Sequence, residues 1–337
     1  MRPDSLAAVS EVAEYVEALW RDGVGPDDGP KLRKLLAQTD DDPARDELRL
    51  FGCWYDLLNG VRAEVPAISG PVETLIVHKA AELMTSRLAR DPVAVDAAMV
   101  ELAELLDRSA DDRPHFAAAR AWADLALGEV ALAVSDLETA RARFEALSEP
   151  SSPIALRITA LLKTASVAMD RRNVEPARYL VREATKLAEA NERPLHAERA
   201  RIGWGLLDSM SGDMPAMRKT LKPLIKKGAI IPRILLAGTE KGHRAMQLLA
   251  DGIREATERN DPFAYLMCIL IGARRYVVMG RDADALLTIT AGITQLTQVA
   301  PPLAKTLVDE RAEWRRNWGE LRYNEAERRA LLLLAPS

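Results

Sequence analysis

Cysteine and histidine are scarce in this sequence of 337 residues. The two cysteines, Cys53 and Cys268, are far apart, and each lies in an apolar stretch. A disulfide framework needs more cysteines, and a zinc site needs ligands at short spacing. The four histidines fall in four different predicted helices: His78, His115, His196 and His243. We therefore expect two reduced core thiols, no metal site, and histidines on helix surfaces or between helices.

Long hydrophobic runs and an excess of one charge are also missing. The longest apolar stretch, residues 264–272, is far shorter than the roughly 20 residues that cross a bilayer. The first residues reach acidic side chains before any sustained apolar run, unlike a secretory signal. The formal net charge of −4 lacks the basic excess typical of a nucleic-acid binder. The sequence thus predicts a cytoplasmic protein with no membrane span and no nucleic-acid partner.

Catalytic signatures are absent as well. The sequence contains no P-loop, no Gly-x-Gly-x-x-Gly after a strand, no Gly-x-Ser-x-Gly and no His-Glu-x-x-His. The acidic run at residues 40–42 lacks the central glycine of a calcium loop, and helix ends and caps explain both this run and Asp27–Asp28. We expect neither enzymatic activity nor a cofactor. An enzyme with a pocket between helices stays open, and it would need a deep cleft with perturbed titratable groups.

What the sequence does have is helix formers in amphipathic order. Hydrophobic residues make up 48% and aromatic residues only 5%, because alanine and leucine supply most of the apolar side chains. No segment shows the two-residue alternation of a strand. Apolar residues near the start recur at spacings of three and four: Leu6, Val9, Val12, Ala13, Val16, Leu19 and Trp20. These features predict an all-α fold with no β-sheet.

Proline, glycine, aspartate and asparagine divide the helical segments. The first predicted helix ends at the turn cluster of residues 23–30, the second covers 31–38, and the third covers 44–64. An Asp-Pro step ends one helix and starts the next, because proline suits the first helical turn. Further breaks of this kind lie at residues 69–71, 90–92, 111–114, 149–153, 191–194 and 260–262.

From residue 111 to about residue 296, two kinds of break alternate, a proline-containing join and a tight turn followed by alanine. The tight turns are residues 172–177, 211–216 and 280–285. The alanines that mark the copies recur at intervals of 37, 39 and 69 residues: Ala140, Ala177, Ala216 and Ala285. Ala245 would divide the last interval into two copies. Two-helix units of this size are typical of helical solenoids.

One of these units, residues 121–154, resembles the tetratricopeptide repeat. Leu127-Gly128 matches the Leu-Gly pair of that repeat's first helix, Ala140 its small residue in the second helix, and Phe144 the aromatic residue four positions later. Small residues at Gly128 and Ala140 allow two helix backbones to approach closely. Later copies keep the small residues, among them Ala184, Gly272 and Ala273, but lack the aromatic residue and are longer.

The resemblance implies a right-handed α-solenoid of antiparallel helix pairs. We expect an irregular helical region over residues 1–110, tetratricopeptide-like repeats over 111–300, and capping helices over 301–337. The polar helix over residues 303–319 has an apolar face suited to such a cap. The leucine run at residues 331–334 has to dock on the last repeat or on another subunit. An irregular helical bundle with chance turns is the alternative.

Ligands of tetratricopeptide arrays usually lie in a concave groove lined by the first helices of the pairs. The resemblance therefore implies partner contacts on those helices, and the sequence offers a candidate set: Arg201, Arg274, Arg275, Tyr276 and Arg315. Arginine forks match carboxylates, so a shared groove would suit an acidic peptide or an exposed carboxyl terminus. Solvated helix faces are the alternative interpretation.

We accordingly predict a non-enzymatic scaffold or adaptor that binds a protein or peptide partner through its concave face, with self-association left open. A ligand- or peptide-sensing regulator, similar to the repeat domains of bacterial regulators, is the alternative. A basic stretch, residues 218–227, fits a solvated helix end better than an anionic surface contact.

Overall fold

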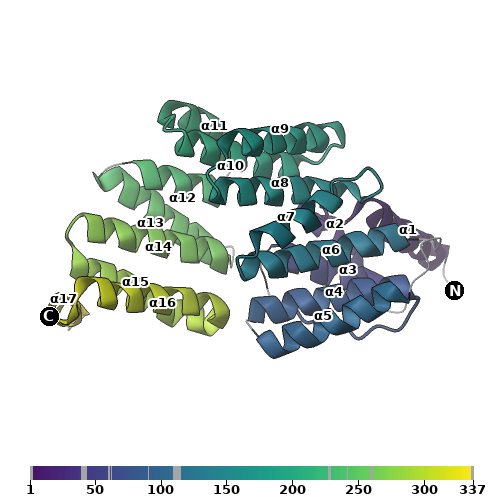
Figure 1. The fold of residues 1–337 in the computed structure, drawn as a ribbon, viewed down its shortest axis with the longest axis horizontal. Helices are drawn as coiled ribbons and strands as arrows, with labels where there is room; N and C mark the ends of the chain where they lie inside the picture. Colours follow the sequence, from purple (N-terminus) through teal and green to yellow (C-terminus); the bar gives the residue numbers. More distant parts are fainter. Residues whose placement is uncertain are drawn as a thin grey trace. The chain divides into compact units, whose positions relative to one another are not determined.

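The computed structural model describes residues 3–38, 44–59, 61, 63–89, 91–108, 115–226, 229–240, 242–258 and 261–334. Over these residues the chain forms α-helices and no strand, so the predicted all-α class of paired helices is confirmed (Figure 1). None of the described helices is both long enough and apolar enough to span a membrane.

The chain divides into two compact units, Met1–Ser211 and Gly212–Ser337. The helices of the first unit are α1 Pro3–Asp22, α2 Gly29–Gln38, α3 Arg45–Leu58, α4 Val72–Ala89, α5 Pro92–Asp107, α6 Phe116–Ala133, α7 Leu137–Ala146, α8 Ile154–Asp170, α9 Val174–Ala190 and α10 Pro194–Met210. Those of the second unit are α11 Met214–Lys226, α12 Ile230–Thr239, α13 Gly242–Glu258, α14 Pro262–Val278, α15 Asp282–Val299, α16 Pro301–Trp318 and α17 Glu320–Leu334. The predicted boundaries at residues 110 and 300 stay predictions.

From α2 to α10, consecutive helices of the first unit pack against each other, as α8 does with α9 and α9 with α10. The helices of the first 110 residues join this stack, because α4 packs on both α5 and α6, and α1 packs on α3 and α8. The third predicted helix is shorter than expected. It ends at Leu58, where the backbone amide of Asn59 closes the last turn on the carbonyls of Tyr55 and Asp56, rather than at residue 64.

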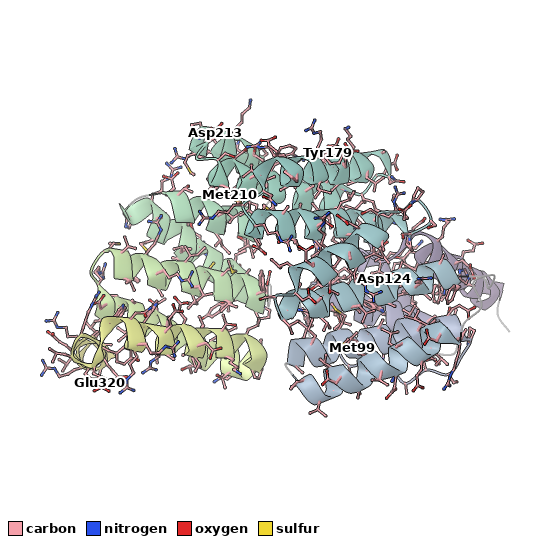
Figure 2. All side chains as sticks on the ribbon, viewed as in Figure 1. Met99, Asp124, Tyr179, Met210, Asp213 and Glu320 are labelled. Atoms are coloured by element: carbon pink, nitrogen blue, oxygen red, sulfur yellow. The ribbon has the colours of Figure 1, made fainter. Side chains whose placement is uncertain are left out.

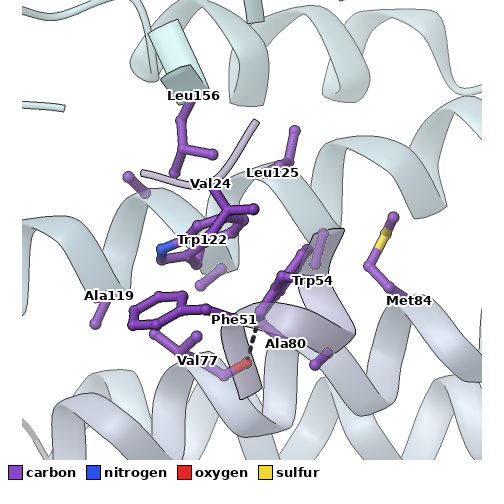
Figure 3. Packing of buried hydrophobic residues seen from close by; sticks show 14 of the residues in the cluster. Val24, Phe51, Trp54, Val77, Ala80, Met84, Ala119, Trp122, Leu125 and Leu156 are labelled. Atoms are coloured by element: carbon purple, nitrogen blue, oxygen red, sulfur yellow. Dashed lines mark hydrogen bonds between the residues drawn. The ribbon is translucent and has the colours of Figure 1, made fainter. Parts of the chain in front are cut away.

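The core of the first unit is built around large aromatic side chains (Figure 3). Trp54 and Trp122 are fully buried with ring centroids 4.4 Å apart, and Phe51 packs beside them. The indole Nε1 of Trp54 donates to the carbonyl oxygen of Val77 at 3.2 Å, which satisfies its one polar atom. These side chains tie α3 and α4 to α6.

The close approach of α6 and α7 is confirmed. Ala140 and Phe144 are fully buried, and a Cβ atom added to Gly128 would lie 2.6 Å from the Phe144 ring. Any side chain at position 128 would therefore displace that ring.

The second helix of each predicted pair places its fourth residue inward. Ala140, Ala177, Ala245 and Ala285 occupy that position in α7, α9, α13 and α15, and all are fully buried. In α11 the fourth residue is Met217, which is buried, whereas Ala216 is only partly buried. The equivalent of Ala140 in this copy is therefore Met217 and not Ala216. The prediction was one residue out of register, because α11 begins one residue later than the prediction required.

Asp27 and Asp28, in the turn before α2, bind the start of α10 instead of serving only their own helix end. Asp27 accepts hydrogen bonds from the Leu195 backbone amide at 2.7 Å and from the His196 ring Nδ1 at 2.7 Å. Asp28 accepts one from Arg193 at 2.9 Å. The cap residue of α10 forms no side-chain cap of its own, so Asp27 caps this helix from a distant part of the sequence.

The second unit is a continuous stack from α11 to α17 in which each helix packs on the next. Residues 303–319 fall mainly in α16, and the apolar face expected there points inward: Leu307 and Trp314 are buried, and Leu303 and Trp318 are half-buried against the same cluster. Gly319, at φ +78°, separates α16 from α17.

Candidate binding groove

The residues predicted as partner contacts lie in both compact units: Arg201 on α10 in the first, and Arg274, Arg275 and Tyr276 on α14 and Arg315 on α16 in the second. α14 and α16 are neighbours, so the four residues of the second unit lie on adjacent helices. Arg201 is half-buried and pairs with Glu189 at 3.4 Å.

Two of the predicted arginines form specific contacts inside the second unit. Arg274 donates two hydrogen bonds to the Glu310 carboxylate, at 2.8 and 2.7 Å, and so joins α14 to α16. This hydrogen bonding holds the pKa of Glu310 below its usual range. Arg275 donates to the backbone carbonyls of Gly238 and Glu240 at the end of α12. These guanidinium groups already stabilise the helix stack.

The other two predicted residues of this unit take part in contacts between an arginine and a ring, and Tyr276 is half-buried against the core cluster. Arg281 lies over the Tyr276 ring at 4.8 Å from its centroid. Arg315 lies over the Tyr323 ring at 5.5 Å, and its nearest carboxylate oxygen, on Glu320, is 4.0 Å away. Arg315 is therefore the member of the set in this unit whose guanidinium is most available to a partner.

The first unit also carries a groove that was not predicted from the sequence. It has a volume of about 630 Å³ and lies between α5, the carboxyl-terminal end of α6 and the start of α7. Met99 on α5 and Asp124 on α6 mark this part of the molecule in Figure 2. Volumes of this size are typical of pockets for small ligands or short peptide segments.

The floor of the groove is apolar. It is formed by side chains from α5 and α6 and from the turn that follows α6: Val95, Met99, Leu127, Val130, Ala131 and Val134. Met99 is 37% exposed and Val134 72% exposed. Exposed apolar side chains grouped in a concave surface are typical of binding sites.

The rim of the groove is acidic. Asp91 and Asp136 cap the starts of α5 and α7 by accepting from the backbone amides of Ala94 and Thr139, each at 3.1 Å. Asp96 is exposed on α5. None of the three carboxylates has a cationic partner in the part of the chain that the structure describes. Hydrogen bonding to Thr139 lowers the pKa of Asp136, so its carboxyl is ionised at neutral pH.

The two arginines that line the groove are neutralised by carboxylates behind it. Arg143 pairs with Asp124 at 2.7 Å. Arg87 pairs at 3.2 Å with Glu129, which is buried and also contacts Lys163. Burial alone would raise the pKa of Glu129, but the two cations overcome this effect and hold the pKa below its usual value. Because Arg87 and Lys163 share Glu129, one positive charge is left against the three rim carboxylates, so the net charge of the described residues at the groove is negative.

A signal for this groove exists in the sequence of α5. Helix α5 has apolar residues on most of its faces, but only Ala98 and Leu102 are buried. Val93 and Val100 are exposed. A helix with more apolar residues than it buries offers a surface to a partner. This excess of apolar residues lies within residues 1–110, which were expected to be irregular. The predicted contacts were arginines on later helices, so they did not include α5.

Within the described residues, no group of three or more histidine, cysteine, aspartate or glutamate side chains is placed to hold a metal ion. Both cysteines are buried and free. Burial raises the pKa of each thiol to about 12, which keeps it in the unreactive protonated form.

Comparisons with known proteins give a structural similarity and no sequence match. No protein-family model matches the sequence, and no curated protein matches it. Among solved structures, the chain is similar to the Rap conjugation gene regulator of the plasmid pLS20, solved in complex with the Phr* peptide. The similarity covers 97% of this chain and 93% of that one, at 12% sequence identity and a TM-score of 0.49.

Proposed function

We propose that this protein is a non-enzymatic helical-repeat adaptor or regulator, with tetratricopeptide-like pairs, that binds a peptide segment of a partner in the groove of α5, α6 and α7. The observation that carries the proposal is the combination of an apolar floor and an acidic rim in one concave surface. The close packing of Gly128 against Phe144 holds two walls of this groove in a fixed position.

The occupant that fits this groove is a short segment with an apolar side chain and a nearby cation. Val95, Met99 and Val134 would bury the apolar side chain, at about 25 cal/mol per Å² of surface removed from water. A lysine, an arginine or a free α-amino group would then meet the carboxylates of Asp91, Asp96 or Asp136, which have no cationic partner among the described residues. Charge complementarity of this kind contributes mainly to specificity and association rate.

A peptide library tests this proposal with defined probes. Fluorescent peptide pools, each fixed for leucine or methionine at one position and for a basic, neutral or acidic residue at another, would be titrated with the full chain. We expect the basic pools to bind, and added salt to weaken that binding because the rim charges are exposed. Binding of acidic pools that Met99→Glu weakens, or no binding of the basic pools, would contradict the assignment of this groove.

Two neighbouring substitutions provide the matched control. Met99→Glu places a charge in the groove and should weaken binding of the selected peptide at least tenfold, about 1.4 kcal/mol. Val100→Glu introduces the same charge on the next residue, which is 61% exposed and does not line the groove, and should leave affinity within about twofold. Equal effects of the two variants would remove the groove as the binding site.

The arginine set stays a second proposed contact, for an acidic segment. Arg315 is the clean test in the second unit, because its nearest carboxylate is 4.0 Å away, whereas Arg274 and Arg275 hold helices together. If Arg315 contacts a partner, Arg315→Glu should abolish binding of acidic peptide pools, whereas Arg316→Glu, one residue away, should not. If acidic pools bind neither the original chain nor the two variants, the arginine set is solvated helix surface.

A further inference from the structure

The last helix, α17, has a buried inner face and an exposed outer face, one edge of which lines a hollow against the start of α15 through Glu325 and Leu332. Its inner face packs on α15 and α16 through Tyr323, Ala326 and Ala330, which are 3, 4 and 7% exposed. Glu327 on the same side binds Arg311 at 2.6 Å. The position and rotation of α17 are therefore fixed within the second unit.

The outer face of α17 carries a narrow stripe in which two leucines flank an acid and a base. Leu321, Glu325, Arg328 and Leu332 follow one another at spacings of four, three and four residues, which places them on one side of the helix. Leu321 is 87% exposed and Leu332 69% exposed. Leu331 and Leu333 extend the exposed apolar surface at the end of the helix.

This stripe is complementary to itself when two copies run in opposite directions. A twofold axis midway between residues 326 and 327 would set Leu321 against Leu332 of a second copy, and Glu325 against Arg328 of that copy. The leucine contact and the ion pair then each form twice. An isologous interface needs this kind of self-complementary surface.

We infer that α17 forms an antiparallel helix pair with α17 of a second copy of this chain, so that the protein self-associates through its second unit. The inference does not rest on the proposed peptide groove, which lies in the first unit. Arg328 has no partner within the described part of the chain, so its charge is available to a second copy. Glu325 pairs with Arg329 of its own helix at 2.5 Å, and the guanidinium of Arg328 from the second copy would join this exposed pair. The contact is small, and such interfaces are weak and reversible.

Charge exchange tests the pairing directly. Sedimentation velocity on the full chain, from about 5 to about 200 µM, should show a reversible monomer–dimer equilibrium. Arg328→Glu and Glu325→Arg should each weaken association at least tenfold, because each places like charges opposite one another twice. The double exchange should restore association to within about threefold of the original chain, since it rebuilds both ion pairs with reversed polarity.

Exposed positions keep this test separate from folding. Leu332→Glu should also abolish dimers, whereas Val278→Glu, at a position that is 87% exposed on α14, should not. Helix content and thermal unfolding would confirm that all variants remain folded. Two outcomes would overturn the inference: a chain that stays monomeric over the whole concentration range, or dimers whose stability neither Arg328→Glu nor Leu332→Glu changes. The exposed leucines would then contact a different partner.

Disulfide trapping tests the direction of the pair. Leu321→Cys and Leu332→Cys chains, mixed and oxidised, should form the mixed disulfide, because these positions face each other only in the antiparallel pair. Leu321→Cys alone should not cross-link, since its two copies would be separated by about 11 residues of helix, roughly 16 Å. The native cysteines are buried and do not compete. Efficient linkage of Leu321→Cys to itself would contradict the antiparallel arrangement.

Discussion

Gly128 sets how closely α6 and α7 approach, because the space for its side chain is filled by the Phe144 ring. Gly128→Ala would place a methyl group 2.6 Å from that ring, and overpacking of this kind costs about 1–3 kcal/mol. The measurement is the free energy of unfolding in urea. Phe144→Leu makes room, so the double variant should lose less stability than the sum of the two single changes. Strict additivity would show that the two residues do not compete for the same space.

Asp27 stabilises the first unit through its charge. Burial opposes its ionisation, but hydrogen bonds from the His196 ring and from the backbone amides of Leu195 and His196 outweigh that effect, so its pKa is lowered. A lowered folded-state pKa adds stability that is fully present above the ordinary value of about 3.9 and is lost as the pH falls below it. Asp27→Ala should therefore cost about 1–2 kcal/mol at pH 7, as for a lost helix cap.

The pH dependence separates this prediction from simple truncation. The stability gap between the original chain and Asp27→Ala should narrow as the pH falls from about 4 toward 3, since the original chain loses its charged cap there. Asp22→Ala is the control, because Asp22 pairs with Arg21, whose side chain is 74% exposed, and such surface pairs contribute little. A gap that stays constant with pH would show that the charge of Asp27 does not matter.

At the scale of helices, Arg274 connects α14 to α16. Its two hydrogen bonds to Glu310 are well aligned, but Arg274 is 63% exposed, so we expect a loss of only about 1 kcal/mol for Arg274→Ala. Arg274→Glu should cost more, because two carboxylates then meet. The exchange of both residues, Arg274→Glu with Glu310→Arg, should recover part of that loss in urea unfolding. No recovery would show that Glu310 depends on the Trp314 indole, which donates to it at 3.0 Å, rather than on Arg274.

Most helices and their pairing could be predicted from sequence, because local chemistry decides them. Proline starts α5, α10 and α14, where the break at each site combines a stop and a start. The register of α11 could not be predicted from sequence. The choice between Ala216 and Met217 as the buried residue depends on where the preceding turn ends and the helix begins. The end of α3 was missed for a related reason: apolar residues continue past Leu58 in the sequence, although the helix does not.

Contacts between distant parts of the sequence could not be predicted from local sequence patterns. Asp27 caps a helix 168 residues further on, and nothing near it in the chain indicates this partner. The groove was missed because its apolar floor combines α5 with the end of α6, so the apolar excess of α5 alone indicates an exposed surface but not its shape. The arginines were easy to find by residue type, yet their binding to Glu310 and to the end of α12 depends on helix packing.

At the scale of the whole molecule, the two proposed interactions belong to different compact units. The groove lies entirely within Met1–Ser211, and α17 with its inner contacts lies within Gly212–Ser337. Each unit has buried clusters of its own, built around the aromatic core in the first and around α14 to α17 in the second. If these clusters suffice for folding, the two functions should be separable by division of the chain between residues 211 and 212.

Such a division gives opposite expectations for the two fragments. The fragment of residues 1–211 should bind the selected basic peptide within about threefold of the full-chain affinity and remain monomeric, because it keeps every groove residue and lacks α17. The fragment of residues 212–337 should self-associate and should not bind that peptide. Fluorescence titration and sedimentation velocity on both fragments, after circular dichroism has shown cooperative unfolding, make the comparison. Peptide binding that appears only in the full chain would mean that residues of the second unit contribute to recognition.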